Sequence, residues 1–74
     1  MALKIFETYN FGGVEIDTIN GVVDRQFRFN SQLNSWDCPA INCIGKHISD
    51  AIKTLQKEGY KLENKRVTRV VCSL

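Results

Sequence analysis

The stretch VEIDTINGVVDRQF, residues 14–27, decides the fold of this chain. Two runs rich in β-branched residues flank the dipeptide Asn20-Gly21. Asn-Gly between such runs is the strongest short signal for a β-hairpin, because a type I′ turn needs positive φ at both of its central residues. The sequence therefore predicts strands at residues 14–19 and 22–29, joined by a two-residue turn.

A two-residue turn also predicts which residues share a face of the hairpin. Counting outward from the turn predicts the opposing pairs Ile19–Val22, Thr18–Val23 and Asp17–Asp24. One face is expected to be apolar and to join the core, and it holds Val14, Ile16, Thr18, Val23 and Phe27, interrupted by Arg25. The other face is expected to be exposed, and it holds Glu15, Asp17, Ile19, Val22, Asp24 and Gln26.

The segments on either side of the hairpin contain weaker signals. Residues 3–9 alternate between apolar and polar side chains and predict a further strand, followed by a turn at residues 10–13. Residues 30–36 are polar and turn-prone, so we expect a loop there. Within that loop, Leu33 and Trp36 are expected to fold back onto the core.

A helix is expected after this loop, because apolar residues recur at spacings of three and four between Ile41 and Leu55. Asp37 is the expected N-cap, with Pro39 in the first turn, and Gly59 is placed to end the helix. A glycine inside a helix costs about 1 kcal/mol relative to alanine. Because Gly45 would lie inside this helix, a start at Asn42 or later is an open alternative.

The last expected strand covers residues 66–74, after a connector at residues 60–65. It has apolar residues on both faces, which predicts a position inside the sheet. The chain is therefore expected to be a single α+β domain over residues 1–74, with the order β-β-β-α-β. We expect a mostly antiparallel sheet with one amphipathic helix packed on one face and the other face open.

Length and composition narrow the class of protein. A chain of 74 residues has little material for an enclosed catalytic cleft, so we expect a protein that is not an enzyme and needs no cofactor. No apolar run approaches the ~20 residues that cross a bilayer, and residues 1–9 do not read as a signal peptide. We therefore expect a cytoplasmic protein without a membrane partner. Domains of this size often associate with a second copy, so a homodimer is an expected form.

The expected exposed face of the hairpin carries the leading functional hypothesis. Formal charge sums to −3 over residues 1–24 and to +5 over residues 25–74. Like charges directly opposite one another destabilise a strand pair, and such conflicts occur at functional sites. Asp17 opposite Asp24, beside Ile19 and Val22, predicts a small protein-binding module that engages a basic partner. An inhibitor or adaptor of phage or mobile-element type, directed at a nucleic-acid-binding complex, fits this description. A merely solvated face and a divalent-cation site are the alternatives.

Two further sets of residues in the sequence could bind a partner or a metal ion. The basic residues Lys61, Lys65, Arg66 and Arg69 define the alternative function, a small nucleic-acid-binding regulatory protein. The three cysteines form an odd count, which favours reduced thiols over a disulfide scaffold. Together with His47, the cysteines Cys38, Cys43 and Cys72 have the ligand types of a zinc site, but their spacing matches no standard zinc pattern. We therefore expect no metal and no catalytic residue.

Overall fold

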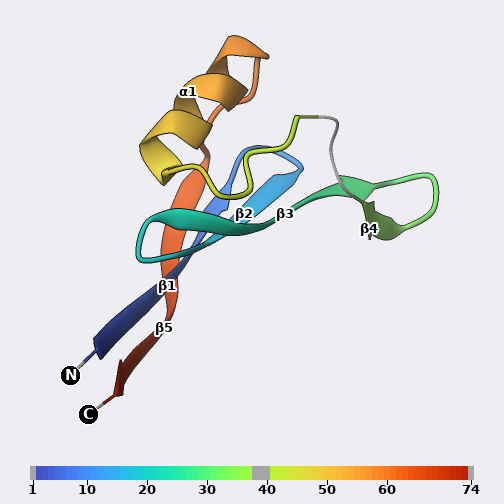
Figure 1. Ribbon diagram of the computed structural model, residues 1–74. Coiled ribbons are helices and arrows are strands. Elements are labelled where there is room, and N and C mark those ends of the chain that lie inside the picture. The colour runs from blue at the N-terminus through green and yellow to red at the C-terminus, as the bar shows by residue number, and fades with distance from the viewer. Residues whose placement is uncertain (1, 38–40, 74) are drawn as a thin grey trace.

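The computed structural model describes residues 2–37 and 41–73. Figure 1 shows one sheet with a single helix on one of its faces. The elements in chain order are β1 (Ala2–Asn10), β2 (Val14–Ile19), β3 (Val22–Asn30), β4 (Ser35–Asp37), α1 (Ile48–Lys57) and β5 (Asn64–Ser73). The sheet is antiparallel throughout, with the strand order β4-β3-β2-β1-β5. The expected α+β class is confirmed.

The turn between β2 and β3 forms as predicted. Asn20 has φ of 51° and Gly21 has φ of 79°, so both central residues lie in the left-handed region that a type I′ turn requires. The turn also fixes the helix, because Gly21 accepts a hydrogen bond of 2.7 Å from the backbone N–H of Ile48. The local signal in the sequence therefore positions an element that lies more than twenty residues away.

A β-bulge changes the register that the turn alone predicts. Thr18 lies opposite Val23 as expected, but Asp17 lies opposite Arg25 rather than Asp24. Asp24 is the extra residue of the bulge, and every later residue of β3 is shifted by one position. The predicted pairing of Asp17 with Asp24 is therefore wrong, and the shift exchanges the faces of the residues that follow.

Helix α1 begins later than the apolar spacing suggests. Its N-cap is His47, whose Nδ1 accepts a hydrogen bond of 3.2 Å from the backbone N–H of Ser49. Asp37 is not the cap, since it belongs to β4, and Pro39 lies outside the described residues. Gly45 has φ of 89°, which a helix interior does not allow, so the alternative of a later start was correct. Gly59, with φ of 93°, ends the helix as predicted.

Three predictions about the segments at the edges of the sheet were wrong. The segment expected to be a loop contains β4, and Leu33 and Trp36 do not reach the core, being 74% and 53% exposed. Strand β5 lies at an edge of the sheet rather than inside it. Val67 and Val70 are exposed there, at 56% and 58%, and not buried as an interior position would require.

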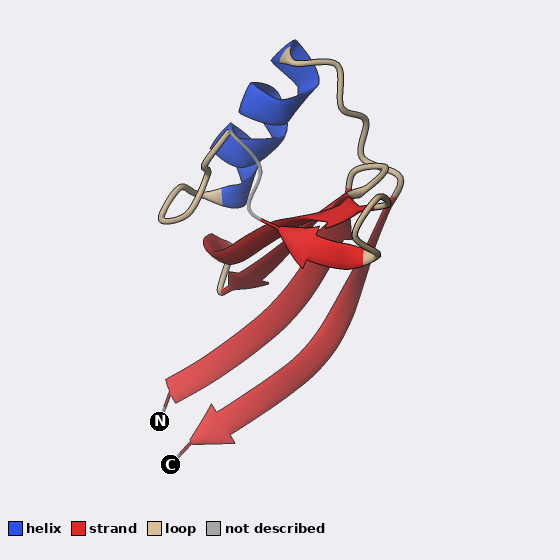
Figure 2. Cartoon of the chain, turned by 90° about the vertical axis from the view of Figure 1, so that its right-hand side faces the viewer, coloured by secondary structure: helices blue, strands red, loops and turns tan. Residues whose placement is uncertain are grey.

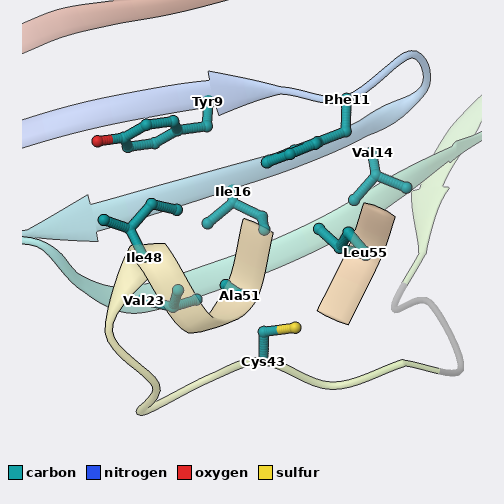
Figure 3. Close-up of a cluster of buried hydrophobic side chains, with 9 residues drawn as sticks. All are labelled: Tyr9, Phe11, Val14, Ile16, Val23, Cys43, Ile48, Ala51 and Leu55. Atoms are coloured by element: carbon teal, nitrogen blue, oxygen red, sulfur yellow. The ribbon is translucent and has the colours of Figure 1, made fainter. Parts of the chain in front are cut away.

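The core lies between α1 and one half of the sheet. Figure 3 shows the buried side chains of β1, the following turn, β2 and β3 directed at the helix and at Cys43 of the preceding loop. The cluster consists of Tyr9, Phe11, Val14, Ile16, Val23, Cys43, Ile48, Ala51 and Leu55.

Beyond this core, β1 and β5 extend as a two-stranded ribbon, which Figure 2 shows reaching away from the helix. The last pair between β1 and β2 joins Phe6 to Ile19, so residues 2–5 pair only with β5. The molecule is accordingly elongated, with extents of 44 × 26 × 19 Å. In the described part of the chain, no helix has the length and apolar character needed to span a membrane.

Candidate functional site

The six residues predicted to form an exposed binding face do not share one environment. Glu15, Asp17 and Ile19 alternate with buried residues of β2 and therefore point to the face opposite the helix. Val22 and Asp24 are exposed, as expected. Gln26 is only 5% exposed, so its assignment to a binding surface was wrong.

The bulge explains the position of Gln26. Its shift of register turns the Gln26 side chain toward the helix side of the sheet, opposite the buried Ile16. There the amide oxygen accepts a hydrogen bond of 2.7 Å from the backbone N–H of Cys43. The amide nitrogen donates a hydrogen bond of 2.5 Å to the carbonyl of Ile41. Gln26 is thus a buried bridge between β3 and the loop before α1.

Two of the three carboxylates that were predicted to repel one another have partners within the molecule. Asp17 accepts a hydrogen bond of 2.9 Å from the hydroxyl of Thr8 and lies opposite Arg25. Glu15 lies 3.7 Å from the guanidinium of Arg66, which comes from β5 across the intervening strand. The acidic hairpin and part of the basic C-terminal strand therefore meet on one face. Within the described residues, Asp24 has no ion-pair partner.

A shallow hollow of about 620 Å³ lies beside β3 and includes Asp24. It runs between the loop that carries Ile44 and the short strand β4. Its walls combine three carboxylates with apolar and aromatic side chains, and its lining residues are Glu15, Asp24, Arg25, Gln26, Phe27, Trp36, Asp37 and Ile44. The hollow is the strongest candidate for a binding site on this chain.

The aromatic wall of the hollow is held in a defined geometry. The ring of Trp36 meets Phe27 edge to face, with centroids 5.0 Å apart, and meets Phe29 at 5.4 Å. The guanidinium carbon of Arg25 lies 5.6 Å from the Phe27 ring centroid. Exposed aromatic and arginine side chains in such contact are the residue types that dominate binding energy at protein interfaces. Trp36 is half exposed and so is open to a partner.

Asp37 also lines the hollow. Its carboxylate pairs with Arg28, with 3.4 Å between Asp37 Oδ1 and Arg28 Nε. Their hydrogen bond, together with the charge of Asp37, raises the pKa of the Arg28 guanidinium above its ordinary value. Oδ1 of Asp37 is buried and accepts no hydrogen bond from the described residues.

The basic residues of the alternative hypothesis are divided by the alternation of β5. Arg66 lies on the open face with Glu15, whereas the ammonium of Lys65 lies 3.0 Å from Glu7 on the helix side. This hydrogen bond to Glu7 raises the pKa of Lys65. Arg69 stacks on the ring of Phe6 at 4.6 Å, and Lys61 precedes β5 in an exposed connector. These four cations are therefore not a single continuous patch.

The cysteines and His47 are also separated. Cys43 is fully buried in the core, and this burial raises the pKa of its thiol. Cys72 lies on the ribbon opposite Leu3, and Cys38 falls outside the described residues. The ring of His47 caps the helix and packs over the Gly21 turn. Among the described residues, no three histidine, cysteine or acidic side chains lie close enough to hold a metal ion.

The sequence did not predict that Trp36 and Phe27 line a hollow together with Asp24. Trp36, an aromatic residue amid polar neighbours, was the available signal, but it was assigned to the core. Phe27 was assigned to the core face because the bulge was not foreseen. Comparison with known proteins found no matching family model, no matching curated protein and no matching solved structure.

Proposed function

We propose that this chain is a small non-enzymatic protein-binding module, whose hollow beside β3 receives an arginine or lysine side chain from a basic partner. The supporting observation is that Asp24, a carboxylate with no ion-pair partner in the described residues, lines the same hollow as the half-exposed Trp36. A long cationic side chain has an apolar stem and a charged head. Aromatic walls suit the stem, and carboxylates suit the head.

The charges of the lining residues favour a cation over an anion. Glu15, Asp24 and Asp37 face a single lining cation, Arg25. Glu15 and Asp37 are also held by Arg66 and Arg28, so Asp24 contributes most to attraction at the mouth. The proposed binding surface is therefore the hollow beside β3, and not the whole exposed face that the sequence predicts for the hairpin. A cytoplasmic inhibitor or adaptor of a nucleic-acid-binding complex, of the kind carried by phages and mobile elements, is the role that this proposal favours.

The single tryptophan of the chain provides a direct test. Short peptides that differ only in arginine, citrulline or norleucine at one position are titrated while Trp36 fluorescence is recorded. We expect the arginine peptide to change the fluorescence and to bind several-fold more tightly than the citrulline peptide, which has the same shape without the charge. Equal binding of the two peptides would remove the proposal.

Variants connect this titration to a natural partner. Asp24→Asn and Trp36→Ala should both weaken arginine-peptide binding and abolish capture of a basic protein from lysate. Glu58→Gln, which removes an equally exposed carboxylate at the end of α1, should do neither. Retention of DNA or RNA that is lost in Arg69→Gln, but unaffected by Asp24→Asn, would instead favour the nucleic-acid-binding alternative.

A further inference from the structure

The two edges of the sheet are protected to different extents. At one edge, β3 pairs with β4, and Val23 exchanges two hydrogen bonds of 2.9 Å with Gly45 and Lys46 of the loop before α1. At the other edge, β5 pairs with β1, and no strand of the described chain lies on its outer side. A long uncovered edge strand is a ready template for pairing with another chain.

The exposed part of this edge is the ribbon. Residues 2–5 and 70–73 extend past the end of β2, and Ala2 pairs with Ser73 at the tip of the ribbon (Figure 1). Leu3 and Val70 are 52% and 58% exposed. A two-stranded ribbon is marginally stable in water, and three or more strands with an apolar face are needed for independent stability. The ribbon therefore lacks the strands that would stabilise it.

The backbone of Val70 is directed outward. Its partner on β1 is Ile5, which exchanges hydrogen bonds of 2.8 and 2.9 Å with Asn20 on the opposite side of β1. In an antiparallel pair, residues opposite each other either exchange both backbone bonds or neither. Because Ile5 bonds to Asn20, the N–H and C=O of Val70 face the outer edge of β5.

The distribution of charge along β5 determines the direction in which a second copy can pair with it. The strand has cations at residues 65, 66 and 69, no acidic residue, and the uncharged run Val70-Val71-Cys72. A parallel copy in register would place each cation beside its equivalent, which is unfavourable. An antiparallel copy centred on Val71 instead places Val70 opposite Cys72 of the other copy and leaves the cations at opposite ends.

We propose that a second copy of this chain pairs with β5 in antiparallel orientation, about a two-fold axis at Val71. The two sheets then become one continuous sheet, as an isologous interface requires. Leu3, Ile5 and Val70 share the helix side of the ribbon, so both copies contribute to one apolar strip over four strands. The proposal is independent of the hollow beside β3, which lies at the far edge of each copy.

The mass in solution tests the proposal. Because the paired segment is short, we expect a weak, reversible dimer, as small interfaces form. Sedimentation equilibrium over protein concentrations from about 10 μM to about 1 mM should show a rise from 8.4 kDa to twice that mass. Val70→Lys should remain at 8.4 kDa, whereas Val67→Lys, at an equally exposed position before the bulge in β5, should still dimerise. A wild-type mass of 8.4 kDa throughout, or equal dimerisation of both variants, would overturn it.

A disulfide tests the register. In a Cys72→Ser background, Val71→Cys places two thiols at the axis, at a separation that a disulfide can bridge. We expect a covalent dimer on mild oxidation, and none from Val67→Cys in the same background. Circular dichroism confirms that each variant is folded. Cross-linking from residue 67 but not from residue 71 would contradict the proposed register.

Discussion

At the scale of single residues, Gln26 shows how one polar side chain can hold a loop in place. Its amide satisfies the N–H of Cys43 and the carbonyl of Ile41, while its own exposure is close to zero. A buried donor left without an acceptor loses its full hydration energy. The amide therefore stabilises the route of the loop that covers the core and carries Ile44 to the edge of the hollow.

Replacing Gln26 by leucine should lower the free energy of unfolding by about 2 to 4 kcal/mol, because the buried N–H of Cys43 loses its acceptor. Urea unfolding monitored by circular dichroism measures this difference. Gln56→Leu, at an exposed position of α1, should change stability by less than about 0.5 kcal/mol. A loss as small as that for Gln26→Leu would mean that the two hydrogen bonds contribute nothing to stability.

Gln26 also marks the limit of what the sequence could predict. The turn at Asn20-Gly21 and the pairs Ile19–Val22 and Thr18–Val23 were predicted correctly, because they depend on backbone preferences of two adjacent residues. The bulge at Asp24 has no comparable local signature. A shift by one residue moves each later side chain to the opposite face, so the predicted environments of Gln26 and Phe27 were both wrong.

At the scale of elements, the hairpin turn connects three parts of the fold. Asn20 accepts a hydrogen bond from the N–H of Ile5 and donates one to the carbonyl of Leu3, at 2.8 and 3.1 Å. The carbonyl of Gly21 accepts a hydrogen bond from the N–H of Ile48, the first residue of α1. A Cβ at Gly21 would lie 3.1 Å from His47 Nε2, so the turn residue and the helix cap fit closely together.

Replacing Asn20 by glycine keeps the positive φ of the turn but removes both side-chain bonds to β1. We expect unfolding to become easier by about 1 to 2 kcal/mol, with faster hydrogen exchange at the amide of Ile5 and little change at Ile48. Asn20→Asp retains an acceptor for Ile5 and should have the smaller effect. Equal acceleration of exchange at Ile5 and Ile48 would show that the substitution disturbs the turn itself.

The elements that the sequence misplaced depend on distant partners. Strand β4 is three residues long, and its Trp36 contacts Phe29 on the neighbouring strand β3. Its short and mostly polar sequence does not reveal this contact. Strand β5 lies at the edge of the sheet with Val67 and Val70 exposed, whereas apolar residues on both faces of a strand predict burial. The hollow could not be located in advance, because β4 forms one of its ends.

At the scale of the whole molecule, the residues that form the core and the residues proposed to pair with a second copy lie at different ends. All nine residues of the buried cluster lie between Tyr9 and Leu55, whereas the ribbon contains none of them. Next to this core, Lys65 of β5 forms an ion pair with Glu7 of β1. The Thr68 hydroxyl also donates a hydrogen bond of 3.1 Å to the carbonyl of Phe6. The first half of β5 therefore supports the core, and its second half extends away from it.

Deletion of residues 70–74 should consequently leave a folded chain. We expect cooperative urea unfolding and an unchanged near-ultraviolet spectrum, because the deletion removes no residue of the buried cluster. Deletion of residues 64–74 should abolish cooperative unfolding, because β1 loses its neighbour beside Tyr9 and the ion pair of Glu7. If both deletions unfold the chain, the ribbon and the core form one cooperative unit. If the shorter deletion retains the native spectrum, the tip of the ribbon can serve pairing without being required for the fold.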